Sequence, residues 1–374
     1  MDINNGAGVN ENDRLFVGGV DFSTANQGLD AYEWHNTRKA PFTIHGLYKP
    51  EEEGLFKRMP PETAALVSKG VEDLNLNPAG GRVRFITDSP SVAVKALEHG
   101  QTLPHHYTRL LSAGFDVYRR DSLGKEVFAG SVPPCCDRFD MVIGKVSVGG
   151  CGKMQEICVN MPVGASLYEL YIGVEKGCRI EKAPDYRIKK PVVFYGSSIT
   201  NGYCASRPGN TYEAYISREL DCDYINLGFS GNCHAEMSMA EYISKLDMSV
   251  FVYDYDHNAP NPGELERTHK PFFDYVRSKR PGLPIILVTR PDFKPDREGE
   301  MLSRCVVMDT YVKARRSGDL KTYYVDGASL FLGQPYFDCT VDGVHPTDNG
   351  FACMGKVIGN AVRTALEALT EDER

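Results

Sequence analysis

The chain has 374 residues and a formal net charge of −8, with 42% hydrophobic and 25% charged residues. This composition is that of a globular protein long enough to bury two hydrophobic cores. The acidic balance excludes the non-specific electrostatic attraction on which nucleic-acid and anionic-membrane binding depend, so we expect a small neutral or cationic substrate and no nucleic-acid partner.

The sequence also lacks the usual signals for membranes and export. No apolar run approaches the roughly 20 residues of a membrane-spanning helix. The first residues, Met1 to Gly6, lack the basic flank and apolar core of a secretory signal. We therefore expect a cytoplasmic protein with no membrane partner.

The ligand-type residues do not form a recognisable metal site. The 11 cysteines are odd in number and show no paired Cys-x-x-Cys spacing, which favours reduced, partly buried thiols. His105 and His106 are adjacent but have no second ligand pair at helical spacing. The sequence predicts no metal and no cofactor.

The N-terminal half, from about Arg14 to Ile180, consists of short β-rich runs separated by turn residues. Alternating and β-branched residues at this spacing are typical of an antiparallel sandwich or jelly roll. One helical segment, Pro61 to Lys69, interrupts the pattern. The clearest predicted strands are residues 82–87, 92–96, 114–118, 141–148 and 167–174.

The segment from Glu181 to Pro191 is charged, contains proline and has no hydrophobic periodicity, which is typical of a linker. We place the boundary near Asp185. The predicted domains are therefore a sandwich over residues 1–185 and a second domain over residues 186–374.

In the second half, continuous apolar runs alternate with helical patterns, which indicates a parallel sheet covered on both faces. The predicted fold is α/β, a flavodoxin-like three-layer domain. Its predicted strands are residues 192–195, 224–227, 250–255, 285–288 and 322–325, and its predicted helices are residues 212–220, 265–280, 298–316 and 349–369.

Polar residues follow several of these strands. Ligands of such sheets bind beyond the carboxyl ends of the strands, where Ser198, Gly231, Asn258 and the pair Asp342 and His345 all lie. An Asp three residues before a His lets the carboxylate hold one ring nitrogen while the other faces a nucleophile. A serine in a glycine turn, Ser198, supplies that nucleophile.

At these residues the C-terminal half resembles the SGNH hydrolases, the GDSL-type esterases and lipases. Their Gly-Asp-Ser block corresponds to residues 196–198, with Ser197 where Asp is usual. Their final Asp-x-x-His block is residues 342–345, Asp-Gly-Val-His. The resemblance implies a catalytic triad of Ser198, His345 and Asp342.

The resemblance also implies an oxyanion hole made by the Ser198 and Gly231 amides and the Asn258 side chain. Asn258 lacks the flanking Gly and Asp of the family block, so Asn261 remains an alternative. The N-terminal half resembles the sandwich that precedes some of these esterases, through Gly114-Phe115-Asp116-Val117-Tyr118, in which Val replaces the Leu of a Gly-x-Asp-Leu-Tyr signature.

Other residues near the proposed site have open roles. His257 and His234 are candidate substrate contacts, although for His257 an ordinary loop histidine is the simpler interpretation. Asp254 and Asp256 could suggest paired glycosidase carboxylates, but solvation of the loop and positioning of Asn258 is the better interpretation.

The sequence therefore predicts a serine esterase that forms an acyl-enzyme and acts on a small-molecule ester. The absence of an amphipathic lid favours a short acyl group, acetyl on a sugar or a similar polar alcohol. Two alternatives remain. The same triad could serve an acyltransferase, or the protein could be a catalytically weak module that binds carbohydrate or protein.

Overall fold

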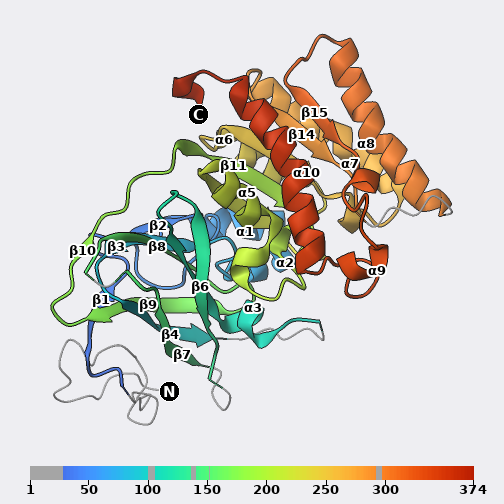
Figure 1. Cartoon of the computed structure of the whole chain (residues 1–374). Helices are drawn as coiled ribbons and strands as arrows, with labels where there is room; N and C mark the ends of the chain where they lie inside the picture. Colours follow the sequence, from blue (N-terminus) through green and yellow to red (C-terminus); the bar gives the residue numbers. More distant parts are fainter. Residues whose placement is uncertain (1–27, 100–105, 136–139, 151, 292–296) are drawn as a thin grey trace.

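The computed structural model describes residues 28–99, 106–135, 140–150, 152–291 and 297–374. Figure 1 shows antiparallel strands of the N-terminal half beside an α/β half that contains the C-terminus. The predicted β pattern between Arg14 and residue 27 lies outside the described residues, as do His105 and Cys136.

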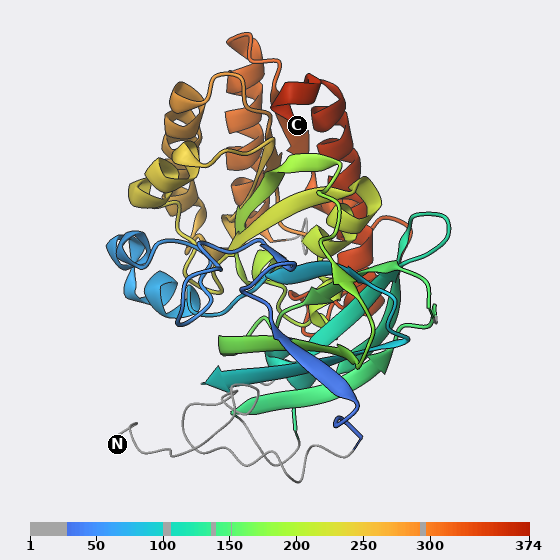
Figure 2. The same cartoon turned by 90° about the vertical axis from the view of Figure 1, so that its left-hand side faces the viewer.

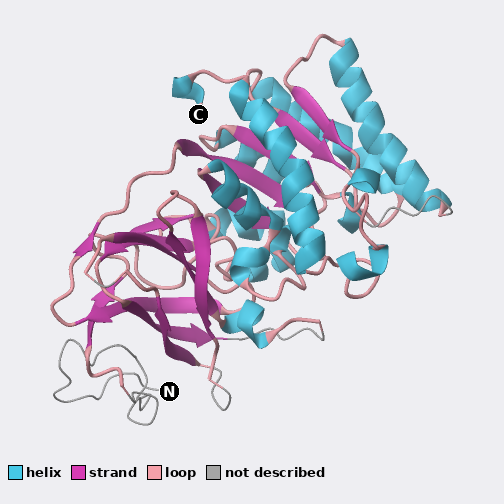
Figure 3. Cartoon of the chain, in the orientation of Figure 1, coloured by secondary structure: helices cyan, strands magenta, loops and turns pink. Residues whose placement is uncertain are grey.

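The N-terminal strands form a β-sandwich, as predicted (Figure 3). One sheet has the order β1 (Tyr32–Asn36), β9 (Ser166–Glu175), β4 (Ser91–His99) and β7 (Met141–Ser147). The other has the order β10 (Ile180–Glu181), β3 (Arg82–Thr87), β8 (Gln155–Asn160), β5 (Phe115–Arg120) and β6 (Glu126–Val132), with β2 (Thr43–His45) also paired to β3. The short helix α3 (Arg109–Ala113) precedes β5.

Strand β3 shows how the sandwich is joined to the second half. Side chains alternate between the faces of a strand. Val83 and Phe85 therefore enter the core between the two sheets. Arg82 lies on the other face, buried, and forms an ion pair with Asp223 of the α/β half.

The second half is the predicted three-layer α/β domain. Its parallel sheet has the order β12-β11-β13-β14-β15, the flavodoxin-like order, because the first strand is flanked by the second and third. The strands are β11 (Ile188–Gly196), β12 (Cys222–Gly228), β13 (Val250–Asp254), β14 (Ile285–Val288) and β15 (Thr322–Val325).

Both faces of this sheet are covered, which explains its continuous apolar strands. In β13, Val250 and Val252 enter one core while Phe251 and Tyr253 enter the other. The longer covering helices are α5 (Tyr212–Leu220), α6 (Met237–Lys245), α7 (Pro262–Lys279), α8 (Glu298–Arg316) and α10 (Asp348–Glu367). Shorter helices are α4 (Ser198–Asn201) and α9 (Tyr336–Cys339), with 3₁₀ turns η1 (Pro208–Asn210), η2 (Asp256–Asn258), η3 (Gly327–Ser329) and η4 (Glu371–Glu373).

The helical segment predicted inside the sandwich is two helices, α1 (Pro61–Val67) and α2 (Lys69–Leu74), divided at Ser68. They do not pack in the sandwich. Ala64 and Val71 are buried in the same core as Phe229 and Met239, and α1 contacts α6 (Figure 2). Chain order therefore assigns these helices to the first half, whereas packing joins them to the second.

The predicted linker is held against the protein. Strand β10 ends at Glu181 and β11 begins at Ile188, and between them Tyr186 is buried, with its hydroxyl accepting a hydrogen bond from Arg82 at 2.9 Å. The division at residue 185 remains a prediction. None of the helices in the described parts of the chain is both long and apolar enough to cross a membrane.

Candidate active site

Ser198 begins helix α4 directly after strand β11. Its neighbour Ser197 is the N-cap, with a hydroxyl that accepts a hydrogen bond from the Ile199 amide at 3.2 Å. Ser and Asp are both preferred N-cap residues, so Ser197 performs the capping for which Asp is equally suited. The side chain of Ser198 is thereby left available for chemistry.

Two glycines allow the close packing of this turn. A Cβ added to Gly196 would lie 2.2 Å from the Asp254 carbonyl oxygen, and one added to Gly228 would lie 2.2 Å from the Asn201 amide nitrogen. Both contacts are with backbone atoms, which cannot move aside cheaply. Glycine at both positions brings α4 directly against the ends of the neighbouring strands.

The structure brings Ser198, His345 and Asp342 together in a line. Ser198 Oγ lies 2.9 Å from His345 Nε2, and His345 Nδ1 lies 2.7 Å from Asp342 Oδ2. The second oxygen, Asp342 Oδ1, accepts hydrogen bonds from the backbone amides of Val344 (2.9 Å) and His345 (2.8 Å). These bonds fix the carboxylate, which in turn fixes the ring.

The electrostatic environment keeps Asp342 ionised and His345 neutral. Partial burial raises the pKa of Asp342, but the hydrogen bonds from His345 and Val344 outweigh it and lower the pKa to about 2. For His345, burial lowers the pKa below its ordinary value of 6.5, more than the bond to Asp342 raises it. At neutral pH the ring can therefore accept a proton from Ser198.

The predicted oxyanion donors lie on neighbouring loops. Gly231 is exposed with φ of 68°, and within the described residues neither its N–H nor that of Ser198 donates a hydrogen bond. Asn258 Nδ2 donates to the Phe229 carbonyl at 3.2 Å. A side-chain amide nitrogen carries two protons, so the second remains for an oxyanion. The alternative, Asn261, is instead the N-cap of α7, accepting from the Glu264 amide at 3.0 Å.

The two predicted substrate-contact histidines lie in different places. His257 is close enough to His345 for its charge to lower the pKa of His345. His234 is exposed and lines a separate hollow of about 140 Å³, together with Tyr255 and Pro260. Of these two histidines, His257 is the one that lies near the proposed base, His345.

A pocket of about 280 Å³ lies between the two halves and adjoins this centre. Tyr203 lines it and lies with its ring centroid 4.3 Å from that of His345. Asn201 lines it from the last position of the Ser198 helix, and Ser230 precedes Gly231. From the first half the lining residues are Gly70, Asp73, Leu74, Asn77, Tyr107, Val163 and Gly164; from the second they are Asn201, Tyr203, Ser230 and Asn232.

The sequence did not indicate the residues of the first half that reach this centre. His106 Nε2 lies 3.6 Å from Asp342 Oδ2, and the Tyr107 ring lies 4.3 Å from that of Tyr203. Gly70 of α2 packs against the side chain of Asn232. These contacts join segments far apart in sequence, and no local pattern identifies them.

The Gly-Phe-Asp-Val-Tyr signature has a structural role at the junction of the halves. Asp116 is fully buried and accepts hydrogen bonds from the Gly209 amide (2.8 Å) and Arg207 (3.2 Å). Arg207 also donates to the Tyr118 hydroxyl at 2.5 Å. The signature thus holds the segment that follows the Ser198 helix.

This segment continues to the loop of His345. The Ser206 amide donates to Asp348 at 2.8 Å, and the Asn210 side chain donates to Asp348 at 2.8 Å. Asp348 is the first residue of α10, three residues after His345. A chain of polar contacts therefore connects the sandwich with the loop that carries the proposed base.

The interpretation of Asp254 and Asp256 as solvating a loop is wrong, because both are 3% exposed. Asp254 accepts hydrogen bonds from the hydroxyls of Tyr212 (3.3 Å) and Thr200 (3.5 Å), and Asp256 accepts one from the Arg290 amide (3.0 Å). Burial together with the Asp256 charge raises the pKa of Asp254 to about 7. Both carboxyl groups are therefore buried acceptors that hold neighbouring segments together at the ends of the strands.

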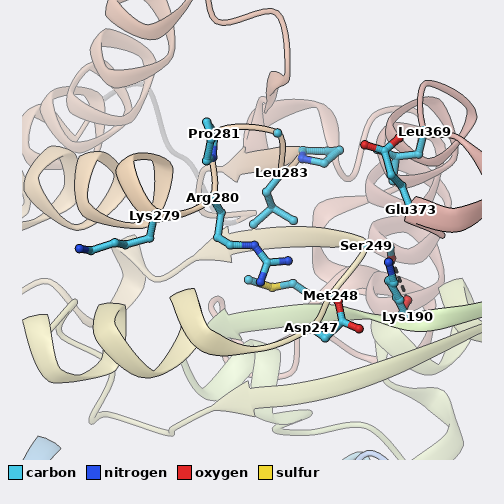
Figure 4. A pocket seen from close by; sticks show the side chains of 12 residues that line it. Lys190, Asp247, Met248, Ser249, Lys279, Arg280, Pro281, Leu283, Leu369 and Glu373 are labelled. Atoms are coloured by element: carbon cyan, nitrogen blue, oxygen red, sulfur yellow. Dashed lines mark hydrogen bonds between the residues drawn. The ribbon is translucent and has the colours of Figure 1, made fainter.

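Two further observations bear on the choice of site. A hollow of about 260 Å³ lies at the amino ends of the strands, opposite Ser198 (Figure 4). Of its cations, Lys190 and Arg280 donate to the carbonyls of Asp372 and Leu246, and Lys279 lies over the Tyr275 ring. In the described residues no group of three or more His, Cys, Asp or Glu side chains could hold a metal ion.

Two family models and several solved structures match the chain. Residues 189–363 match the model of the GDSL-like Lipase/Acylhydrolase family. Residues 32–180 match the model named GxDLY, the N-terminus of Esterase_SGNH_hydro-type proteins. No curated protein matches the chain.

Solved structures share both halves of the fold. A Bacteroides ovatus ATCC 8483 protein described as a GDSL-like lipase is 27% identical, with a TM-score of 0.80 over 90% of this chain and 98% of the other. The salicylyl-acyltransferase SsfX3 of a tetracycline biosynthetic pathway is 21% identical (TM-score 0.72; 91% and 98%). The acetyl xylan esterase Est2A of Butyrivibrio proteoclasticus is 11% identical (TM-score 0.59; 90% and 99%).

Proposed function

We propose that this chain, whose residues 189–363 belong to the GDSL-like lipase/acylhydrolase family, is a serine esterase that removes short acyl groups from a carbohydrate or similar polar alcohol. The observation that carries the proposal is the alignment of Ser198 Oγ, His345 and Asp342 through contacts of 2.9 and 2.7 Å. This is the arrangement that activates a serine hydroxyl for acyl transfer.

In the proposed mechanism, His345 Nε2 takes the proton of Ser198 as Oγ attacks the ester carbonyl. Asp342 holds the other ring nitrogen and stabilises the imidazolium that forms. The Ser198 and Gly231 amides and Asn258 Nδ2 donate to the oxyanion. His345 then passes its proton to the leaving alcohol, and a water molecule releases the acyl group by the same steps in reverse.

The pocket between the halves supports a neutral, hydroxylated alcohol as the leaving group. No Lys or Arg is among the described residues that line it, so these residues offer no charge partner for an anionic substrate. Tyr107 and Tyr203 offer aromatic surface, and Asn77 and Ser230 offer polar groups for hydroxyls. Its volume of about 280 Å³ suits a small ring better than a long acyl chain.

Kinetics with a panel of 4-nitrophenyl esters from acetyl to octanoyl, and with acetylated monosaccharides, tests the proposal. We expect the highest kcat/KM for acetyl esters, and a loss of about 10³-fold or more in Ser198→Ala, which keeps the fold because only a hydroxyl is removed. Activity of Ser198→Ala within tenfold of the wild type would contradict the nucleophile assignment.

The same assay separates hydrolysis from acyl transfer. An added alcohol acceptor should leave free acid as the main product of an esterase. A dominant transacylated product would instead identify an acyltransferase that uses the same triad.

A further inference from the structure

Arg58 is a buried cation that the proposed mechanism does not use. It lies in the loop before α1, in the first half of the chain, and is 1% exposed. Among the described residues no carboxylate forms an ion pair with it. Because burial of a charge without a partner is unfavourable, the position requires an explanation.

The partners of the Arg58 guanidinium within the described part of the chain are all neutral. It donates to the Gly228 carbonyl, to Asn201 Oδ1 at 3.3 Å and to the Leu74 carbonyl at 2.6 Å. It also lies 4.3 Å above the centroid of the Phe229 ring. Burial lowers the pKa of Arg58 to about 9, so the side chain remains charged at neutral pH.

Two of these contacts join Arg58 to the segments that carry Ser198 and Gly231. Asn201 ends the four-residue helix that begins with Ser198. Gly228 ends β12 and begins the loop, residues 228–232, that carries Gly231. One guanidinium thus bridges the nucleophile helix and this loop, a geometry that its planar fork of donors permits and a single ammonium does not.

We propose that Arg58 is a positioning residue of the esterase, which aligns the Ser198 and Gly231 amides for the oxyanion and places an uncompensated positive charge beneath them. The inference rests on the proposed function. It assigns a catalytic contribution to a residue of the N-terminal half that does not touch the substrate.

The positive charge of Arg58 would stabilise the transition state of ester cleavage. In that state, negative charge develops on an oxygen that the Ser198 and Gly231 amides hold. Each of these two residues is three residues from a group that Arg58 contacts. Three residues span at most about 10 Å. With a hydrogen bond added at each end, the two charges lie within roughly 15 Å. Opposite charges at that separation, with an effective dielectric constant of about 20, correspond to roughly a sixfold increase in rate.

The test compares Arg58→Met and Arg58→Lys with the wild type on 4-nitrophenyl acetate, with active sites counted by stoichiometric reaction with an organophosphate. Per titrated site, Arg58→Met should lower kcat about 10- to 100-fold and change KM less than about threefold. Arg58→Lys should recover part of kcat, since it restores the charge but not the bridge between Gly228 and Asn201.

Arg82→Met is the matched control, because Arg82 is another buried arginine of the first half but pairs with Asp223, away from Ser198. It should lower the melting temperature and leave kcat per titrated site unchanged. If Arg58→Met behaves in the same way, Arg58 is structural only and the inference is overturned.

Arg58→Lys decides the matter should Arg58→Met fail to fold. A kcat per titrated site equal to that of the wild type would refute the bridging role, and a loss of about threefold or more at unchanged KM would support it. Failure of the proposed function would be seen separately, without any change at Arg58. In that case the Ser198→Ala variant would keep the esterase activity of the wild type.

Discussion

At the scale of single residues, two opposing effects set the pKa of the His345 ring. Burial lowers the pKa of the ring, and the bond to Asp342 raises it by a smaller amount. Only the neutral ring can accept the Ser198 proton, so protonation at low pH abolishes catalysis. We expect kcat/KM to rise with pH through an apparent pKa below 6.5 and then to be level, as a pH–rate profile would measure.

The neighbouring histidines provide a control for this assignment. When charged, His257 and His106 each lower the pKa of His345. Replacement of His106 by Gln should therefore move the acid limb to higher pH. An apparent pKa above 7 in the wild type, unaffected by His106→Gln, would indicate that another group controls the profile.

Asn258 and Asn261 form a pair of variants that tests the third oxyanion donor. Asn258→Ala removes a donor next to the Gly231 loop and should lower kcat by about 10² to 10³ with little change in KM. Asn261→Ala removes only the cap of α7, at a cost of about 1 kcal/mol in stability, and should leave kcat unchanged. The reverse pattern in steady-state kinetics would transfer the role to Asn261.

At the scale of elements, the signature on β5 acts as a clamp between the sandwich and the segment after α4. Asp116→Ala would leave Arg207 and the Gly209 amide without their buried acceptor. Loss of one partner of such a pair costs about 3 kcal/mol. Urea unfolding should show this decrease in the free energy of unfolding.

The same clamp connects to the His345 loop through Ser206, Asn210 and Asp348, so Asp116→Ala should also reduce kcat. Asp185→Ala is the surface comparison, because its side chain is 53% exposed and its ion-pair partners among the described residues are two lysines of the linker. It should change neither property measurably. Equal effects of the two substitutions would refute the clamp.

At the scale of the whole molecule, the two halves share their cores. Ala64 and Val71 of the first half are buried with Phe229 and Met239, and Leu111 and Val163 are buried with Ile199. A chain that begins at Ile188 would expose these apolar surfaces and lose Arg58. We expect it to be insoluble or to unfold at a much lower temperature than the full chain.

Expression and thermal unfolding of that truncated chain are the measurements. A soluble, cooperatively folded product with the same kcat and KM as the full chain on every ester would show that the sandwich is dispensable. Separate production of residues 28–181 provides the complementary control, since loss of the α/β half should expose Met59, Ala64 and Val71.

The sequence by itself determined the strands and helices that depend only on residues close together in the chain. Strands β3, β14 and β15 and helices α5 and α8 have the predicted bounds, because apolar runs and a 3.6-residue period depend only on neighbouring residues. It also located the segments that carry Ser198, Gly231, Asn258 and His345, because parallel strands deliver their carboxyl ends to one edge of a sheet.

Only the tertiary structure decided which half α1 and α2 join, what Asp116 holds, and where Arg58 is buried. Two of the partners of Arg58, Gly228 and Asn201, are 170 and 143 residues away in sequence. A polar side chain is buried at a site that distant segments of the chain form together. The residues next to it in the sequence therefore do not predict its burial. The pocket between the halves has the same origin, since it exists only once both are packed together.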